Sequence, residues 1–544
     1  MTRIAPPEML SMRTRDGVRL DADVYRPVTD GRHPVLLMRQ PYGRRIASTV
    51  CYAHPAWYAA QGYIVVVQDV RGRGSSAGEF ALFEQEAADG ADAVAWAAAL
   101  PGSTGRVGMY GFSYQGVTQL LAAATLPPAL GAIAPAMIGW DLRRDWAYEN
   151  GAFCLAANLG WAVQLAAQAA RRAGDAAAFA ELADAARTIP LGRDVHARPD
   201  VLHRHAALAP HYADWIDRRF DDPYWDRISP AAQGGVLTRQ GPPALFIGGW
   251  YDTHLPGTVA AFRAYAAAGA VEAALEVGPW AHFPWGRRLG GMDFGDAAIG
   301  DIDRRQIAWF DRHLKNAAPR PASETPVRLF DMGTRAWRDL SAWPDADVIW
   351  HLASDGRAAL DETAGRLVPD AGEDDSIDHL VHDPWRPVPT VGGAFGPVAG
   401  PVDRTDTDAR PEVLTYTSAP LDAPMPLTGT ATVELAVTAD QPSFDLSCIL
   451  SVVDASGRAR HLAEGYAHFA TAPAGAARVA LRPTCATIAC GERLRLSIAA
   501  ASFPAWPVNP GTGARPLDAP AATAEVITLR IAVRDSRLRL PVLP

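Results

Sequence analysis

The chain has 544 residues, of which 49% are hydrophobic and 20% are charged. These values are ordinary for a globular protein, and the length exceeds what one hydrophobic core normally holds, so we expect two or three domains. Acidic residues outnumber lysine and arginine by 60 to 51, which gives a net charge of −9, and no basic run stands out. This balance argues against a nucleic-acid partner.

The five cysteines, at positions 51, 154, 448, 485 and 490, are odd in number and irregularly spaced. No pair has the Cys-x-x-Cys spacing of a zinc or redox site, so we expect reduced thiols and a cytoplasmic location. The first residues lack the apolar run of a signal peptide. Residues 152–170 are uncharged and about long enough to span a membrane, but Asn158, Gln164 and Gln168 favour a buried helix instead. We therefore expect no membrane association.

The N-terminal third alternates between strand and helix signals. Residues 9–25 flank Asp16-Gly17, a turn signal, and predict a β-hairpin. Short apolar runs then indicate strands that are buried on both faces of a parallel sheet. We predict such strands at 35–38, 63–67, 107–110 and 132–137, with helices at 84–100 and 115–125. This order indicates a doubly wound α/β sheet.

The pattern changes between residues 141 and 233, where alanine-rich stretches favour helices and no strand signal is evident. Strand patterns resume at 244–247 and 274–277. A single α/β sheet that is interrupted by a helical cap explains this order.

The chain changes again after residue 350. Residues 353–428 are rich in Pro, Gly and Asp and predict long loops. Apolar and polar residues then alternate at 432–437, 494–498 and 527–533, which indicates an antiparallel β-sandwich, a jelly roll. We therefore predict an α/β domain in two parts at 1–140 and 236–350, a cap at 141–235 and a sandwich at 351–544.

A candidate nucleophile, Ser113, lies in Gly111-Phe112-Ser113-Tyr114-Gln115-Gly116, between a buried strand and a helix. A strand-to-helix turn that exposes a serine needs small neighbours, and its usual pattern is Gly-x-Ser-x-Gly. The second glycine comes one place late here. The motif alone is therefore also compatible with a plain strand–helix turn that has a capping serine.

Two later residues are candidate partners of this serine. Asp252 follows the strand at 244–247, and His282 follows the strand at 274–277. Taken singly, they could be a turn aspartate and a structural histidine. Together with Ser113 they have the order Ser, Asp, His of α/β-hydrolases, at the strand ends where open α/β sheets have their sites. We predict that these three residues form a catalytic triad.

The oxyanion of such a reaction needs hydrogen-bond donors. Tyr42 lies in the loop after the strand at 35–38, which commonly supplies one donor. We predict that the Tyr42 hydroxyl is that donor, although tyrosine after proline is also common in turns. The backbone N–H of Tyr114 would be the second donor.

Several segments together resemble the cocaine-esterase-like (CocE/NonD) hydrolases, which are related to X-Pro dipeptidyl-peptidases and α-amino acid ester hydrolases. The shifted glycine of the serine motif also fits this family. The matching segments, which run through nearly the whole chain, are 39–42, 68–80, 111–116, 249–252, 278–282, 310–314, 327–330 and 502–504.

The resemblance implies an α/β-hydrolase fold with a helical cap and a C-terminal jelly roll. It implies the same triad and the same two tyrosines of the oxyanion hole. Trp146 and Trp161 resemble aromatic residues that line the family's acyl pocket, although core packing of the cap explains them equally well. His254 replaces a pocket phenylalanine, which puts benzoyl-ester specificity in doubt, and Phe395 is a further expected pocket residue.

Other candidate sites are weaker. Gly72-Arg73-Gly74 lacks the next glycine of a dinucleotide loop, so it reads as a turn, in which Asp69 and Arg71 could form a buried ion pair. His203, His205 and His211 have no accompanying acidic or cysteine set and read as surface histidines. The carboxylates at 373–375 read as an exposed loop. No metal and no cofactor is expected.

We therefore interpret the chain as a cofactor-free hydrolase that cleaves an ester or amide bond of a small molecule through an acyl-enzyme. One alternative is an X-Pro dipeptidyl-peptidase or α-amino acid ester hydrolase on the same scaffold, which would need carboxylates to bind a substrate ammonium group. A non-catalytic protein that binds carbohydrate or a protein partner is an alternative of another class. The family resemblance also makes a homodimer plausible.

Overall fold

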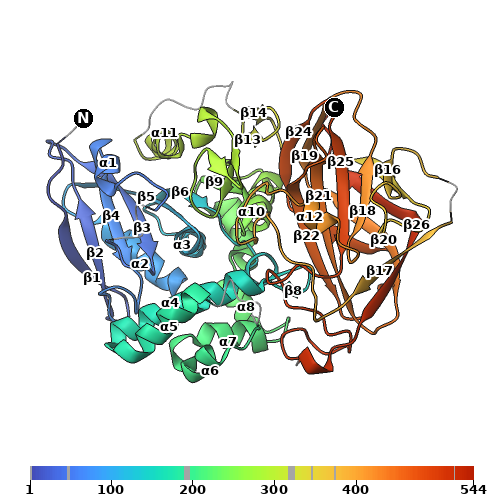
Figure 1. Cartoon of the computed structure of the whole chain (residues 1–544). Coiled ribbons are helices and arrows are strands. Elements are labelled where there is room, and N and C mark those ends of the chain that lie inside the picture. The colour runs from blue at the N-terminus through green and yellow to red at the C-terminus, as the bar shows by residue number, and fades with distance from the viewer. Residues whose placement is uncertain are drawn as a thin grey trace.

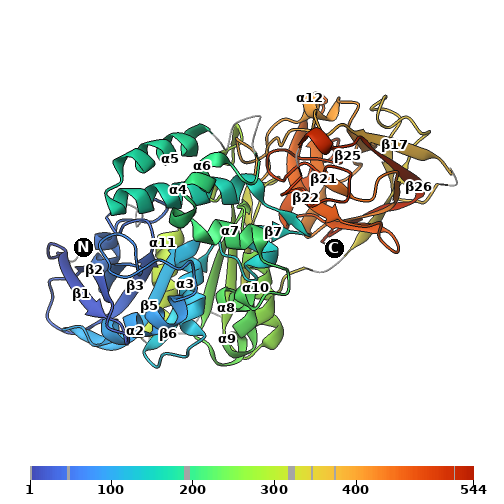
Figure 2. The same cartoon turned by 90° about the horizontal axis from the view of Figure 1, so that it is seen from below.

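The computed structural model describes residues 3–45, 50–188, 196–315, 325–344, 347–372, 375–519 and 521–543. Figures 1 and 2 show a mixed sheet at the N-terminal end, a group of helices beside it, and a second, β-rich part that contains the C-terminus. Two of the three carboxylates at 373–375 lie outside the described residues.

The first sheet confirms the predicted α/β fold. Its strand order is β1-β2-β4-β3-β5-β6-β9-β10-β13-β14, and the pairs from β4 to β13 are parallel. The antiparallel pair β1–β2 is the predicted hairpin. The strands are β1 (Glu8–Arg13), β2 (Arg19–Tyr25), β3 (His33–Gln40), β4 (Ile64–Asp69), β5 (Ser103–Phe112), β6 (Leu130–Ala136), β9 (Ala244–Tyr251), β10 (Ala273–Ala281), β13 (Val327–Asp331) and β14 (Ala336–Leu340).

Helices cover both faces of this sheet. One face packs against α2 (Glu86–Ala98), α3 (Tyr114–Ala123) and α10 (Leu255–Ala268). The other face packs against α1 (Pro55–Ala60) and α11 (Ile302–Leu314). Because both faces are covered, strands such as β4 and β9 are buried along their whole length, which explains their continuous apolar sequences.

The predicted cap is a group of helices between β6 and β9 (Figure 2). Its longest helix is α4, and no described helix is long and apolar enough to cross a membrane. The helical elements are η2 (Arg143–Ala147), α4 (Leu155–Ala173), α5 (Ala176–Thr188), α6 (Asp200–Arg204), η4 (Ala206–Leu208), α7 (Pro210–Asp217), α8 (Pro223–Ile228), η5 (Pro230–Gln233) and α9 (Gly234–Gln240).

The expectation that this region holds no strand is wrong in one place. A short antiparallel pair joins β7 (Tyr148–Glu149) to β8 (Ala152–Phe153). The turn between them is Asn150-Gly151, and both residues have positive φ, 45° and 83°. Asn-Gly is the strongest sequence signal of such a two-residue turn, so the hairpin was detectable in the sequence.

The C-terminal part is the predicted β-sandwich. Its main sheet has the order β22-β21-β25-β18-β16-β15-β26-β20-β23, while β17 pairs with β26 and β19 with β24. All these pairs are antiparallel except β16–β18. The strands are β15 (Val348–Ala353), β16 (Arg366–Val368), β17 (Ile377–His382), β18 (Leu414–Ser418), β19 (Met425–Gly429), β20 (Thr432–Ala439), β21 (Phe444–Val453), β22 (Ala459–Phe469), β23 (Ala477–Ala480), β24 (Thr484–Ile488), β25 (Arg493–Ala499) and β26 (Ile527–Leu540).

Short elements complete the described chain. They are β11 (Arg288–Leu289), β12 (Met292–Asp293), η6 (Asp296–Ile299), α12 (Thr405–Asp408) and η7 (Ala521–Thr523). The domain boundaries at 140, 235 and 350 remain predictions.

The interpretation of 353–428 as long loops is wrong, because β16, β17, β18 and β19 lie there. Strand β17 shows why the pattern was hidden. Its inward residues are Asp378, Leu380 and His382, so two of the three buried positions are polar. Asp378 is satisfied inside the sandwich by the hydroxyls of Ser354 and Tyr416, at 3.0 and 2.9 Å. A buried acid that is satisfied in this way removes the apolar alternation on which the prediction depends.

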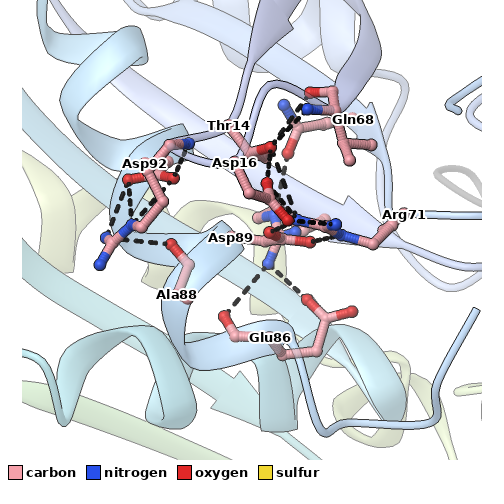
Figure 3. Close-up of polar contacts among 11 residues, drawn as sticks. Thr14, Asp16, Gln68, Arg71, Glu86, Ala88, Asp89 and Asp92 are labelled. Atoms are coloured by element: carbon pink, nitrogen blue, oxygen red, sulfur yellow. Dashed lines mark hydrogen bonds and ion pairs between the residues drawn. The ribbon is translucent and has the colours of Figure 1, made fainter. Parts of the chain in front are cut away.

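The expected ion pair between Asp69 and Arg71 does not form. Arg71 instead binds Asp16 at 2.7 Å and Asp89 at 2.6 Å, as Figure 3 shows. Asp69 binds Arg44, both through the guanidinium at 2.5 Å and through the backbone N–H at 2.7 Å. Asp69 therefore fixes the loop after β3.

Candidate active site

The predicted triad residues lie at one edge of the first sheet. Ser113 directly follows β5, Asp252 follows β9 and His282 follows β10. These strands are parallel members of one sheet, so their carboxyl ends point the same way, and open α/β sheets have their sites at that edge.

Ser113 has the backbone of a nucleophile elbow. Its φ of 60° and ψ of −128° are strained for a residue with a side chain, as expected for a serine that projects from a sharp strand-to-helix turn. A Cβ on Gly111 would lie 2.5 Å from Cβ of Gln115. A Cβ on Gly116 would overlap the side chain of Ile138 and lie 2.9 Å from the carbonyl oxygen of Ala136. The late glycine is therefore required where α3 crosses β6.

His282 is held by Asp252. The distance between His282 Nδ1 and Asp252 Oδ1 is 2.7 Å, so Nδ1 donates to the carboxylate and Nε2 is left for another partner. The ring of His282 lies 5.4 Å from that of Phe112, the residue before Ser113. Asp252 is fully buried. Burial opposes its ionisation, but the hydrogen bond and charge of His282 outweigh that effect, so the pKa of Asp252 is lowered.

Arg482, from the loop between β23 and β24 of the sandwich, holds the Asp252 turn from behind. It donates to the carbonyl oxygens of Asp252 and Thr253, each at 2.9 Å. Its charge is balanced by Glu149, at 2.7 Å. Sequence reasoning missed this contact, because nothing local links positions 482 and 252.

Tyr42 lies beside Ser113. Its hydroxyl accepts a hydrogen bond from the indole N–H of Trp161 at 3.1 Å. Burial raises the pKa of Tyr42 to about 12, although hydrogen bonds with Trp161 and Ser113 and the nearby charge of Arg73 act in the opposite direction. The phenol therefore keeps its proton at neutral pH and can donate it in a hydrogen bond.

Tyr114 offers a backbone donor, not a side-chain one. It is the first residue of α3, so the helix itself does not use its N–H. Its side chain is buried away from solvent, where it stacks on Phe83 and donates to Glu86 at 2.7 Å. Glu86, labelled in Figure 3, also pairs with the buried Arg39. These contacts fix the first turn of α3.

A cavity of about 920 Å³ lies at this edge of the sheet. It brings together most of the predicted site residues, and its lining includes Tyr42, Ser113, Trp146, Trp161, His254 and His282. The sequence did not single out as site residues several charged and polar residues that also line it, among them Arg73, Gln164, Gln168, Arg171 and Arg172. The α4 members recur every three or four residues, as one helix face requires, and this spacing was the available signal.

His254 forms part of an aromatic wall. Its ring stacks on Trp146 at 3.9 Å and meets the ring of His282 edge-on at 5.1 Å. Burial lowers the pKa of His254 to about 3, so it is neutral at physiological pH. Phe395, by contrast, is not brought to the cavity. It packs 4.9 Å from Trp506, with the guanidinium of Arg482 at 4.7 Å from its ring.

The three cap histidines have different surroundings. His203 is exposed, and His205 contacts Glu181 at 2.8 Å. His211 is buried between Trp161 and Trp215 and is therefore not the surface residue that we expected. Within the described ranges, no three His, Cys, Asp or Glu side chains gather as metal ligands would.

Two family profiles match the chain. Residues 16–284 match the X-Pro dipeptidyl-peptidase (S15 family), and residues 321–539 match the X-Pro dipeptidyl-peptidase C-terminal non-catalytic domain. The first match contains the three predicted triad residues.

Similar proteins are known along the whole length. Cocaine esterase of Rhodococcus sp. (strain MB1 Bresler) is 33% identical over 92% of this chain and 91% of its own. The structure of an aminopeptidase from a marine sediment Thaumarchaeota archaeon has a TM-score of 0.79, with 22% identity over 99% of this chain and 96% of the other. An α-amino acid ester hydrolase has a TM-score of 0.78, with 21% identity over 100% and 97%.

The two solved structures agree on the fold, and the cocaine esterase match extends over both parts of the molecule. Together with the two family profiles, this match identifies the chain as a cocaine-esterase-like member of the X-Pro dipeptidyl-peptidase (S15) family, a serine hydrolase of ester or amide bonds.

Proposed function

We propose that this hydrolase cleaves an ester or amide bond of a small molecule through an acyl-enzyme on Ser113, with His282 as base and Asp252 as the residue that orients it. The observation that carries the proposal is the 2.7 Å contact between His282 and the buried Asp252, with His282 and Ser113 on the lining of one cavity. This is the arrangement that activates a serine hydroxyl.

In the acylation step, Nε2 of His282 takes the proton of Ser113 Oγ as Oγ bonds to the acyl carbon. The carbonyl oxygen becomes an oxyanion, which accepts hydrogen bonds from the Tyr42 hydroxyl and the Tyr114 N–H. The bond to the alcohol or amine then breaks, and the leaving group takes the proton from His282. Asp252 stabilises the cationic imidazole in between.

In the deacylation step, His282 takes a proton from water, and the resulting oxygen bonds to the acyl carbon. The same two donors hold the second oxyanion. The bond to Ser113 Oγ then breaks, Oγ recovers the proton from His282, and the carboxylic acid leaves. No cofactor takes part in either step.

The alternative of an amine-recognising peptidase or ester hydrolase needs acidic groups near the acyl site. Among the described residues that line the cavity there is no Asp and no Glu. We therefore favour the simpler esterase or amidase. Amino acid 4-nitrophenyl esters with free and with blocked amines separate the two, because a preference of kcat/KM for the free amine would favour the alternative.

A fluorophosphonate probe tests the catalytic proposal against a purely binding function. We expect one covalent adduct on Ser113 in the folded protein, and neither adduct nor esterase activity in Ser113→Ala. Ser103→Ala, which changes a buried serine at the start of β5, is the matched control and should still be labelled. A folded wild-type protein that takes up no probe would contradict the proposal.

We also propose a cytoplasmic location and a homodimer. All five cysteines are free, which fits a reducing compartment. The dimer is supported by the family resemblance alone. Light scattering on the purified chain should give twice the mass of 58.1 kDa, and a monomer at micromolar concentration would contradict it.

A further inference from the structure

Arg73 is a buried cation on the wall of the cavity. Its side chain lies in the turn after β4, and the residue is only 4% exposed. Its guanidinium stacks over the ring of Phe80 at 4.0 Å and donates through Nη1 to the carbonyl oxygen of Leu165 at 3.2 Å. Its Nε is buried and has no hydrogen-bond partner. Neither contact neutralises the charge.

The other buried arginines of the described chain are all neutralised. Each of them lies within ion-pair distance of a carboxylate, whereas Arg73 has no such partner. These five residues are Arg39, Arg44, Arg404, Arg482 and Arg495. A buried charge without a counter-ion is costly, so the exception needs an explanation.

The other charged residues on the cavity wall are positive as well. Arg171 and Arg172 line it as well, no described lining residue is acidic, and neither arginine has an ion pair among the described residues. Arg172 donates instead to the carbonyl oxygens of Gly74 and Ser76, at 2.7 and 2.6 Å, and so fixes the turn that carries Arg73. His254 does not add a charge, because burial lowers its pKa to about 3. The described residues that line the cavity therefore carry a net positive charge at neutral pH.

We propose that the natural substrate carries a carboxylate or similar small anion, which enters the cavity and supplies the missing counter-ion of Arg73. The inference rests on the proposed function, because it concerns a substrate that reacts at Ser113. A charge-assisted contact with a guanidinium is strong where water is excluded, so the same arginine would both bind and select such a substrate.

The fold also sets the spacing between the anion and the reacting bond. The indole of Trp161 contacts Tyr42, next to the proposed oxyanion, whereas Arg73 contacts α4 at Leu165. These two α4 positions are one turn apart, which corresponds to about 6 Å along the helix. The substrate anion should therefore be separated from the ester carbonyl by a short linker, such as a few methylene groups or one aromatic ring.

Two matched substrate pairs test the proposed preference for an anionic substrate, one for each side of the ester bond. Mono-4-nitrophenyl glutarate against 4-nitrophenyl pentanoate has the anion on the acyl side. The 4-acetoxybenzoate anion against its neutral methyl ester has it on the alcohol side. We expect kcat/KM to favour the anionic member by roughly tenfold or more in one pair, which also assigns the side. Equal rates or a neutral preference in both pairs would overturn the proposal.

Variants assign the preference to Arg73. Arg73→Gln should remove the anionic preference, measured as the ratio of kcat/KM between the two members of a pair, and Arg73→Lys should restore part of that preference. Arg187→Gln removes the same charge from an exposed position of α5 outside the cavity lining and should leave both the preference and kcat/KM for the neutral esters unchanged. An anionic preference that survives in Arg73→Gln would overturn the assignment.

These tests distinguish a failure of the proposed anion preference from a failure of the proposed hydrolase function. If Arg73→Gln does not fold, the wild-type substrate pairs still decide. If neutral esters react through Ser113 without any anionic preference, this inference fails and the proposed function stands. If Ser113 takes up no fluorophosphonate, the proposed function fails first.

Discussion

Asp252 uses its two carboxylate oxygens unequally. Oδ1 accepts from His282, whereas Oδ2 is buried without a hydrogen-bond partner in the described structure. The residue is therefore built to hold one histidine in one tautomer, with its carbonyl oxygen fixed by Arg482. A neutral side chain of the same size should keep the shape of Asp252 but should no longer fix the tautomer of His282.

We expect Asp252→Asn to lower kcat by roughly 10³- to 10⁴-fold, because the amide no longer fixes the imidazole tautomer or stabilises its cation. Asp378→Asn is the matched control, a fully buried aspartate of the sandwich whose loss affects stability alone. Initial rates with a 4-nitrophenyl ester measure the effect. A fall of less than about tenfold in Asp252→Asn would argue against its role.

The hydroxyl of Tyr42 is the proposed side-chain donor to the oxyanion. Because burial raises its pKa to about 12, the phenol remains a donor throughout the usual assay range. Tyr42→Phe removes the donor and keeps the ring, so kcat should fall roughly 10²-fold or more with little change in KM. Tyr265→Phe, which removes a buried hydroxyl from α10, should leave kcat unchanged. A change confined to KM would mean that Tyr42 only binds substrate.

His211 links protonation to stability. Burial lowers its pKa to about 3, with a smaller effect of Arg73 in the same direction. Between about pH 3 and 6.5 the unfolded chain then binds one proton more than the folded chain. The free energy of unfolding should therefore fall as the pH drops below about 6.5, by up to about 1.4 kcal/mol per pH unit.

His211→Phe should remove that part of the slope and fill the same space between the tryptophans. Urea unfolding at pH 5, 6 and 7 measures how the free energy of unfolding depends on pH. His203→Gln changes an exposed histidine and should keep the wild-type dependence. An unchanged slope in His211→Phe would contradict the neutral state of the buried histidine.

At the scale of elements, the crossing of α3 and β6 depends on Gly116. A Cβ there would overlap Ile138 and approach the backbone of Ala136, so Gly116→Ala should destabilise the fold by about 1–3 kcal/mol and reduce fluorophosphonate labelling. Gly235→Ala is the control, because Gly235 is an exposed position of α9 and nothing lies within 4 Å of the added methyl group. It should be neutral or stabilising. Thermal unfolding and labelling rates distinguish these outcomes.

The sequence predicted those strands and helices whose buried residues form a regular pattern along the chain. The strands of the first sheet are continuous apolar runs, and the positions of Ser113, Asp252 and His282 follow from the ends of such runs. It did not predict β17, where the buried polar residues Asp378 and His382 interrupt the apolar alternation, or the β7–β8 hairpin, which only a turn dipeptide marks. Arg73 was missed for the same reason as Arg482: a side chain's unpaired state or distant partner leaves no local pattern.

At the scale of the whole molecule, Arg482 connects the sandwich to the turn that carries Asp252. Arg482→Met leaves Glu149 buried without its partner and removes two donors from the turn, so it should cost about 3–5 kcal/mol of stability and lower kcat as well. Combining it with Glu149→Gln should recover most of the stability and little of the activity. Recovery of both together would mean that Arg482 has only a structural role.

The position of Arg482 in the chain also affects how the enzyme matures. The three residues of the proposed triad are all synthesised before residue 300, yet the turn of Asp252 is fixed by a side chain that is encoded two hundred residues after His282. At ordinary ribosomal rates that interval lasts roughly 10–40 s. We therefore expect a nascent chain whose first sheet has already formed to remain inactive until the sandwich docks, which would delay hydrolysis until synthesis is nearly complete.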